Sequence, residues 1–150
     1  MIKGFCWHVH HDGLLEWCYS YKERIAHIKV SKPAEEQELR LHLLQPVKGQ
    51  LPQPLIEAGN AYDETSNAFK KAGGAFSKAW DTFHKAGNPY PKRRDAYEKA
   101  GVAYHETRDA YIKARDTYHE ALVRYQPEIK ALHKLECPDC PWDGTTIFGR

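Results

Sequence analysis

Residues 61–86 read AYDETSNAFKKAGGAFSKAWDTFHKA, and residues 96–125 read AYEKAGVAYHETRDAYIKARDTYHEALVRY. In both stretches an aromatic residue returns every seventh position. Small residues stand one position before most of these rings and three positions after them. This spacing of three and four predicts helices with an apolar stripe, packed as a coiled coil, with the charged residues on the solvated side. The aromatic heptad positions are Tyr62, Phe69, Phe76, Phe83, Tyr90, Tyr97, Tyr104, Tyr111, Tyr118 and Tyr125, and Leu55 and Leu132 extend the series.

The repeat is interrupted at residues 86–91, which read AGNPYP. Glycine favours the backbone conformation that ends a helix, and proline is accommodated in the first turn of the next one. We therefore predict helices over residues 55–86 and 92–125, and a short helix over 127–136. Two helices of similar length with a short connection predict an antiparallel hairpin in which rings pack against small residues. The alternative is a longer rod that associates in parallel, which the two prolines disfavour.

The N-terminal part of the chain has a different residue pattern. Residues 2–9 are rich in strand formers, and residues 38–43 alternate polar and apolar side chains, so both are predicted to be strands. Between them, apolar side chains from Leu14 to Ile28 recur on one helical face. This order predicts a β-α-β element. Asp12-Gly13 leaves an alternative open, in which a hairpin turn leads into a second strand.

The predicted fold is therefore mainly α-helical with a small α+β head. Three regions are expected: a head over residues 1–52, a helical hairpin over 53–136, and a Cys-containing tail over 137–150. The head is too small to bury much core by itself. Because an antiparallel hairpin brings residue 130 back to the level of residue 55, we expect the tail to pack on the head.

Composition narrows the class of protein. The 150 residues carry 22 Lys and Arg against 20 Asp and Glu, a net charge of only +2. This balance argues against a strongly electrostatic nucleic-acid binder. No apolar run is long enough to span a membrane, and the first residues lack the apolar core of a signal peptide. We expect a cytoplasmic protein with reduced thiols.

A candidate zinc site lies in the tail. Cys137 and Cys140 have the C-x-x-C spacing that lets two thiolates face one tetrahedral ion, and the four residues Cys-Pro-Asp-Cys resemble the knuckles of zinc-ribbon proteins. His133 lies one helical turn earlier. Since no second C-x-x-C exists in the chain, further ligands must come from elsewhere, and Cys6 is the preferred one. His8 and His10 share the strand face of Cys6 and are further candidates. The alternative is four reduced thiols without metal.

Two other segments suggest different functions. His8 to Asp12 contains an H-x-H pair at the end of a predicted strand, which would suit a metal-dependent hydrolase or nuclease. Lys92, Arg93 and Arg94 form the longest basic cluster, and could bind a phosphate or an acidic partner, as in a nucleic-acid-associated zinc-knuckle protein. No P-loop, G-x-G-x-x-G or G-x-S-x-G motif occurs.

Together these patterns favour a non-enzymatic structural or protein-interaction module that presents a long helical hairpin, with Zn²⁺ joining head and tail. A two-helix hairpin leaves one edge of each ring open, so we also expect a protein partner or self-association into a homo-oligomer.

Overall fold

The computed structural model describes residues 3–85 and 91–149, without the side chains of residues 91 and 92. By internal contacts the chain divides into two units, residues 1–59 with 122–150, and residues 60–121. In chain order the elements are β1 (Gly4–Trp7), β2 (Leu15–Cys18), α1 (Tyr21–Ser31), α2 (Ala34–Leu43), β3 (Gln45–Pro46), α3 (Gln53–Lys85), α4 (Pro91–Arg124) and α5 (Gln126–Glu136).

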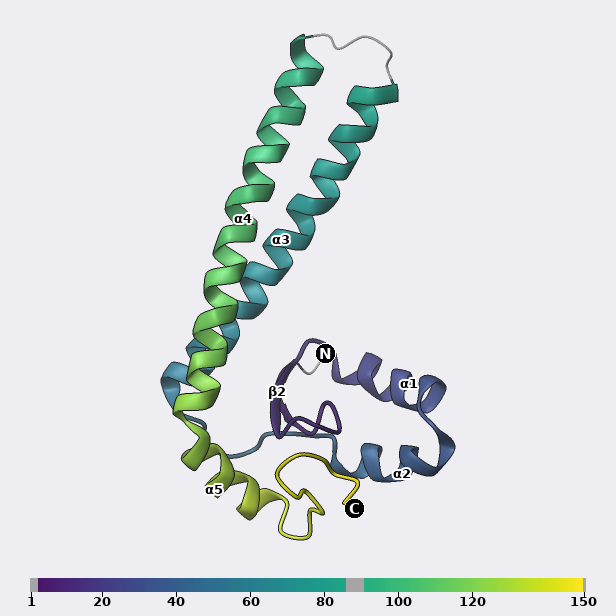
Figure 1. Cartoon of the computed structure of the whole chain (residues 1–150), viewed down its shortest axis with the longest axis vertical. Helices are drawn as coiled ribbons and strands as arrows, with labels where there is room; N and C mark the ends of the chain where they lie inside the picture. Colours follow the sequence, from purple (N-terminus) through teal and green to yellow (C-terminus); the bar gives the residue numbers. More distant parts are fainter. Residues whose placement is uncertain (1–2, 86–90, 150) are drawn as a thin grey trace. The chain divides into compact units, whose positions relative to one another are not determined.

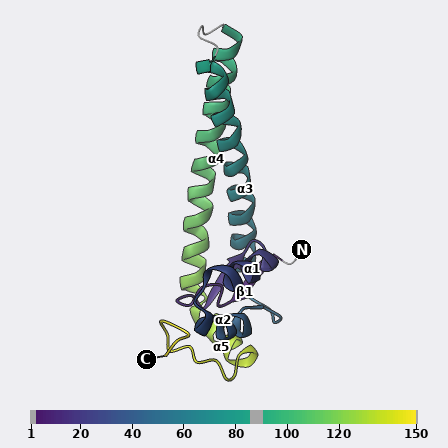
Figure 2. The ribbon, with the colours of Figure 1, turned by 90° about the vertical axis from the view of Figure 1, so that its right-hand side faces the viewer.

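Helices α3 and α4 form an antiparallel hairpin, and they run side by side in both views (Figures 1 and 2). Its direction follows from ring contacts, because Tyr62 stacks on Tyr118 at the start of α3 whereas Phe83 stacks on Tyr97 near its end. Between these ends the rings of the two helices alternate in one continuous ladder, with neighbouring ring centroids 4.9–5.8 Å apart. The order of the ladder is Tyr118, Tyr62, Tyr111, Phe69, Tyr104, Phe76, Tyr97 and Phe83.

The predicted hairpin is therefore confirmed, and its helix bounds agree with the structure to within two residues. The rings of the two helices also stack on one another, which was not predicted from the sequence. Two glycines lie beside the rings: a Cβ at Gly101 would lie 3.4 Å from the ring of Phe76, and one at Gly73 would lie 3.6 Å from Tyr104, and both are ordinary van der Waals contacts. The predicted turn at residues 86–90, with the ring of Tyr90, lies outside the described residues.

The small sheet has the strand order β2-β1-β3, and both pairings are antiparallel. Trp17 of β2 lies opposite Phe5 of β1, and their rings meet edge to face at 5.3 Å. The predicted helix from Leu14 to Ile28 is wrong, because its first part is strand β2 and α1 begins only at Tyr21. The alternative hairpin around Asp12-Gly13 is confirmed. Ser20 marks the true helix start, since its hydroxyl accepts a hydrogen bond from the amide of Glu23.

The predicted strand over residues 38–43 is also wrong, because these residues belong to helix α2. Pro33 immediately precedes the helix, and Glu35 and Glu36 lie in its first turn, where acidic side chains are favourable. Glu36 then binds the buried guanidinium of Arg40 one turn later, at 2.6 Å. The β-α-β order is thus replaced by β-β-α-α-β.

The unit of residues 1–59 and 122–150 is organised around a compact core. The largest side chains with less than 2% exposure are Trp7, Ile28, Leu44, Leu55, Ile129 and Ile147. Ile147 belongs to the C-terminal tail, and its amide donates to the carbonyl of His11 in the β1–β2 turn. Contacts of this kind hold the tail against the strands. Among the described residues, no helix combines the length and apolarity needed to cross a bilayer.

Candidate metal centre

His8 lies directly after β1, in the turn that leads to β2. Its backbone adopts a positive φ of 51°, which is uncommon for a residue other than glycine. The turn supports this conformation, because the amide of His8 donates to the carbonyl of Leu14 and the ring Nδ1 contacts the carbonyl of Gly13 at 3.2 Å. A carbonyl only accepts hydrogen bonds, so Nδ1 carries the proton and Nε2 presents its lone pair.

Two residues from the C-terminal end of the chain meet this lone pair. Nε2 of His133, in the last turn of α5, lies 3.0 Å from Nε2 of His8, and Sγ of Cys140 lies 3.1 Å from the same atom. All three ligand atoms lie within 4.8 Å of one another. Ligand atoms around one tetrahedral zinc ion are separated by about 3.3–3.8 Å, given Zn–N and Zn–S bonds of about 2.0–2.3 Å. The triad therefore has the donor types and spacing of a zinc site with little rearrangement.

Burial keeps both imidazoles neutral. Desolvation, followed by the charge of His133, lowers the pKa of His8 to about 4, and desolvation also lowers the pKa of His133. Burial raises the pKa of Cys140. Neutral imidazoles are competent ligands at neutral pH, and a coordinated thiol loses its proton to the field of the cation.

A carboxylate fixes the end of α5 beside the site. Glu136 accepts a hydrogen bond from the indole Nε1 of Trp7 at 2.8 Å and from the amides of Lys48 and Gly49. Burial disfavours its charge, but these hydrogen bonds prevail and lower the pKa of Glu136 below its ordinary value. The ring of Trp7 also packs edge-on against His133 at 5.2 Å. Glu136 and Trp7 thus position His133, and neither was identified in the sequence.

Of the sequence-predicted ligands, Cys140 and His133 belong to the convergent group, and His8 joins them from the wider candidate list. Cys137 lies at the C-cap of α5 and is partly exposed. Burial, followed by the charges of Cys140 and Glu136, raises the pKa of Cys137 to about 11. Cys137 does not belong to the convergent group of the described residues.

Cys6 has a different environment from the other predicted ligands. It is buried in the apolar cluster with Val9, Ile28 and Leu44, and its thiol is hydrogen-bonded to that of Cys18 on β2. This contact lowers the pKa of Cys18 to about 7 and raises that of Cys6. The structure therefore does not bring Cys6 to the group of His8, His133 and Cys140.

The H-x-H pair also does not converge on one point. His10 is exposed and binds Glu16, with its Nδ1 2.7 Å from a carboxylate oxygen. Asp12 is exposed, and His11 contacts Thr146 of the tail. Only His8 of this segment enters a group with metal-binding geometry among the described residues.

The basic cluster of residues 92–94 and a hollow along α4 lie outside this centre. In the basic cluster Arg94 forms an ion pair with Glu98, and Arg93 lines a groove of the hairpin, while the side chain of Lys92 lies outside the described residues.

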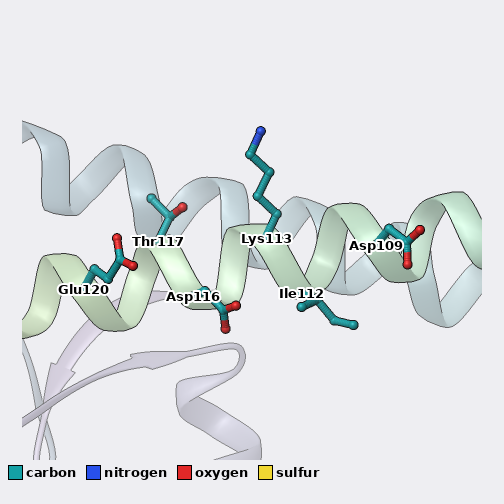
Figure 3. Close-up of a pocket in the computed structure, with 6 residues that line it drawn as sticks. All are labelled: Asp109, Ile112, Lys113, Asp116, Thr117 and Glu120. Atoms are coloured by element: carbon teal, nitrogen blue, oxygen red, sulfur yellow. The ribbon is translucent and has the colours of Figure 1, made fainter.

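A separate open hollow of about 490 Å³ lies along α4 (Figure 3). Lys113 points away from Ile112 and Asp116 in this view. The carboxylates that line this hollow do not belong to a convergent metal-binding group of the described residues. The lining residues are Asp109, Ile112, Lys113, Asp116, Thr117 and Glu120.

Comparisons of the chain with known protein families, with curated proteins and with solved structures find no match.

Proposed function

We propose that the chain is a zinc-stabilised structural module that presents a long helical hairpin for protein interaction. His8, His133 and Cys140 would bind Zn²⁺, and Cys137 would complete a tetrahedral His₂Cys₂ site. The convergence of the first three ligand atoms is the observation that supports this proposal. Mixed nitrogen and sulfur donors with tetrahedral geometry are typical of structural zinc sites.

A structural role is favoured by where the ligands lie in the chain. One ligand follows β1 and the others lie at least 125 positions later, in α5 and the tail. A metal ion that joins such distant segments restricts the unfolded chain strongly, and binding free energy then becomes folding free energy. Such a crosslink would add to the stability that the apolar core of this unit supplies. We also propose that the chain is divided into a head, a hairpin and a tail over residues 1–52, 53–136 and 137–150.

Catalysis is less well supported than a structural role. A catalytic zinc ion needs an open coordination position for water or substrate. The ring of Trp142 packs against His8 at 5.5 Å, and both histidines of the group are at least 91% buried. The hydrolase hypothesis needs His8 and His10 on one metal ion, whereas His10 binds Glu16 on the surface. No observation specifically favours the nucleic-acid hypothesis.

Metal analysis of the purified full-length chain tests the proposal. We expect about one zinc ion per chain, and chelator should lower the thermal midpoint and loosen the tail, measured by proteolysis near residues 137–149. Titration of Co²⁺ into the metal-free protein should give the absorption spectrum of a tetrahedral site with thiolate ligands. Absence of bound zinc together with an unchanged midpoint in chelator would refute it.

A further inference from the structure

One side of the hairpin is lined by small residues that remain exposed. They stand one position before the stacked rings on both helices, and we refer to them as the alanine face: Ala61, Ala68, Ala75 and Thr82 on α3, and Ala96, Ala103, Ala110 and Thr117 on α4. The corresponding residues three positions after the rings are half-buried or buried. The two small-residue positions therefore differ in role, and only one of them is used within the hairpin.

The alanine face is hollowed between the two helices. A mostly apolar groove of about 350 Å³ is lined by Ala75, Lys78, Ala79 and Thr82 of α3 and by Arg93 and Ala96 of α4. Lining from both helices places their alanine rows on the same side of the hairpin. Most rings of the ladder, such as Phe76 and Tyr104, are only half-buried. An apolar groove above half-open rings is a surface that further helices can cover.

The order of the charged residues that border the alanine face favours a second copy of this chain as the partner. On α4 the exposed border residues Lys99, Glu106, Lys113 and Glu120 alternate in sign. When a second α4 runs in the opposite direction, centred between residues 109 and 110, Lys99 meets Glu120 and Glu106 meets Lys113. All four residues then face the opposite charge on the other copy.

The charged residues that border the alanine face on α3 place the centre of a reversed helix pair at the same level, independently of those on α4. Glu64 and Lys71, both exposed, face each other in a reversed pair of α3 helices that is centred between residues 67 and 68. The ring of Phe69 lies between those of Tyr104 and Tyr111, so residues 67–68 of α3 lie level with residue 109 of α4. One two-fold axis therefore satisfies both borders.

We propose that a second copy of this chain covers the alanine face, packed face to face and antiparallel, so that α3 lies on α3 and α4 on α4 in a four-helix arrangement. Small residues let the helices approach closely, and a two-fold axis makes the contact self-complementary. A parallel two-fold arrangement is less favourable, because it sets Lys78 against Lys99. This proposal does not depend on the metal site, which lies in the other unit.

Charge reversal in the full-length, metal-loaded chain tests the pairing. Glu106→Lys should weaken dimerisation by about tenfold or more in sedimentation equilibrium, because it sets two lysines opposite each other. Adding Lys113→Glu in the same chain should restore the dimer. Glu98→Lys changes an exposed charge away from the alanine face and should leave the dimer intact, and zinc content should not change in any variant.

A cysteine crosslink tests the direction of packing. Ala110→Cys places a thiol next to the proposed axis, so mild oxidation with diamide should yield a disulfide-linked dimer. Ala96→Cys lies on the same face but far from the axis and should give no more crosslinking than the parent chain, whose own cysteines set the background. The proposal is overturned by a monomer at the highest attainable concentration, by equal crosslinking at both positions, or by binding only to a different protein.

Discussion

The Nε2 atoms of His8 and His133 lie 3.0 Å apart, although 125 positions separate the two residues in the chain. Each ring is held from its other side, His8 by the carbonyl of Gly13 and His133 by the indole of Trp7. The approach of two imidazole nitrogens is stable only when at most one carries a proton at that position, or when both share a cation. With zinc bound as proposed, the pair would link folding of this unit to both pH and metal.

Removal of a proposed ligand should lower zinc content, whereas removal of a core thiol should not. Cys140→Ser and His133→Ala each delete one member of the convergent group, and we expect both variants to lose stoichiometric zinc in metal analysis. Cys6→Ser is the matched control, because this thiol contacts Cys18 instead. It should cost about 1–3 kcal/mol of stability through a buried hydroxyl and keep its zinc. Loss of zinc from Cys6→Ser alone would contradict our ligand assignment.

The metal-free protein should become less stable as the pH falls from about 6.5 to about 4. In this range the unfolded chain binds a proton at His8 that the folded chain excludes, since folding lowers the pKa of His8 from 6.5 to about 4. The stability is fully present above pH 6.5, and the loss is on the order of 3 kcal/mol. Urea unfolding in chelator across this range measures it.

The variant His8→Gln isolates this contribution from other groups that titrate in acid. It should flatten the pH dependence, whereas the exposed control His119→Gln should leave the dependence unchanged. Equal pH profiles for the parent chain and His8→Gln would show that burial of His8 does not govern acid sensitivity.

The sequence predicted the hairpin because its signal is repeated many times along the chain. The shorter elements of the head were harder to predict, since few residues specify each of them. From Leu14 to Ile28 the apolar spacing fits a helix, yet pairing with β1 makes residues 15–18 a strand. In α2 the alternating leucines suggested a strand, but the helix start after Pro33 and the Glu36–Arg40 pair prevail.

The candidate metal centre was also only partly accessible from the sequence. The C-x-x-C spacing and the nearby His133 pointed to the tail, and hairpin geometry pointed to the N-terminal strand as the source of further ligands. Choosing among Cys6, His8 and His10 required the position at which β1 ends. The left-handed backbone of His8 turns its side chain toward α5. This conformation could not be predicted from any pattern in the sequence.

Glu136 should support the metal site without binding the metal. Glu136→Gln removes the charge that accepts hydrogen bonds from Trp7 and from the amides of Lys48 and Gly49. We expect a loss of about 1–3 kcal/mol in stability and a weaker zinc affinity, by about tenfold or more, in competition with a chelator. Glu57→Gln, an exposed carboxylate on α3, is the control and should change neither quantity appreciably. Unchanged zinc affinity in Glu136→Gln would exclude a positioning role.

The ring ladder should determine the stability of the hairpin. Phe76 stacks on Tyr97 and Tyr104 at 5.3 Å each, so Phe76→Ala removes two ring contacts and opens a gap beside Gly101. Because the ring is half-buried, we expect a loss of about 2–3 kcal/mol in urea unfolding, at the lower end for a phenylalanine truncation. Val102→Ala, at a position that is 57% exposed on the same hairpin, should cost about 0.5 kcal/mol or less. Similar losses in both variants would mean that ring stacking contributes little.

Two glycines of α3 should respond oppositely to the same substitution. A Cβ at Gly59 would lie 2.7 Å from the ring of Phe5 and 2.8 Å from that of Trp17, whereas a Cβ at Gly74 would meet nothing within 4 Å. Both changes to alanine bring a similar gain in helix propensity of about 1 kcal/mol, so their difference reports the steric clash. We expect Gly74→Ala to stabilise the chain and Gly59→Ala to destabilise it by about 1–3 kcal/mol in urea unfolding. Phe5 and Trp17 are flat rings held by the sheet and cannot withdraw as a flexible side chain would. Equal stabilisation by both substitutions would show that the start of α3 does not pack on β1 and β2 as closely as the structure has it.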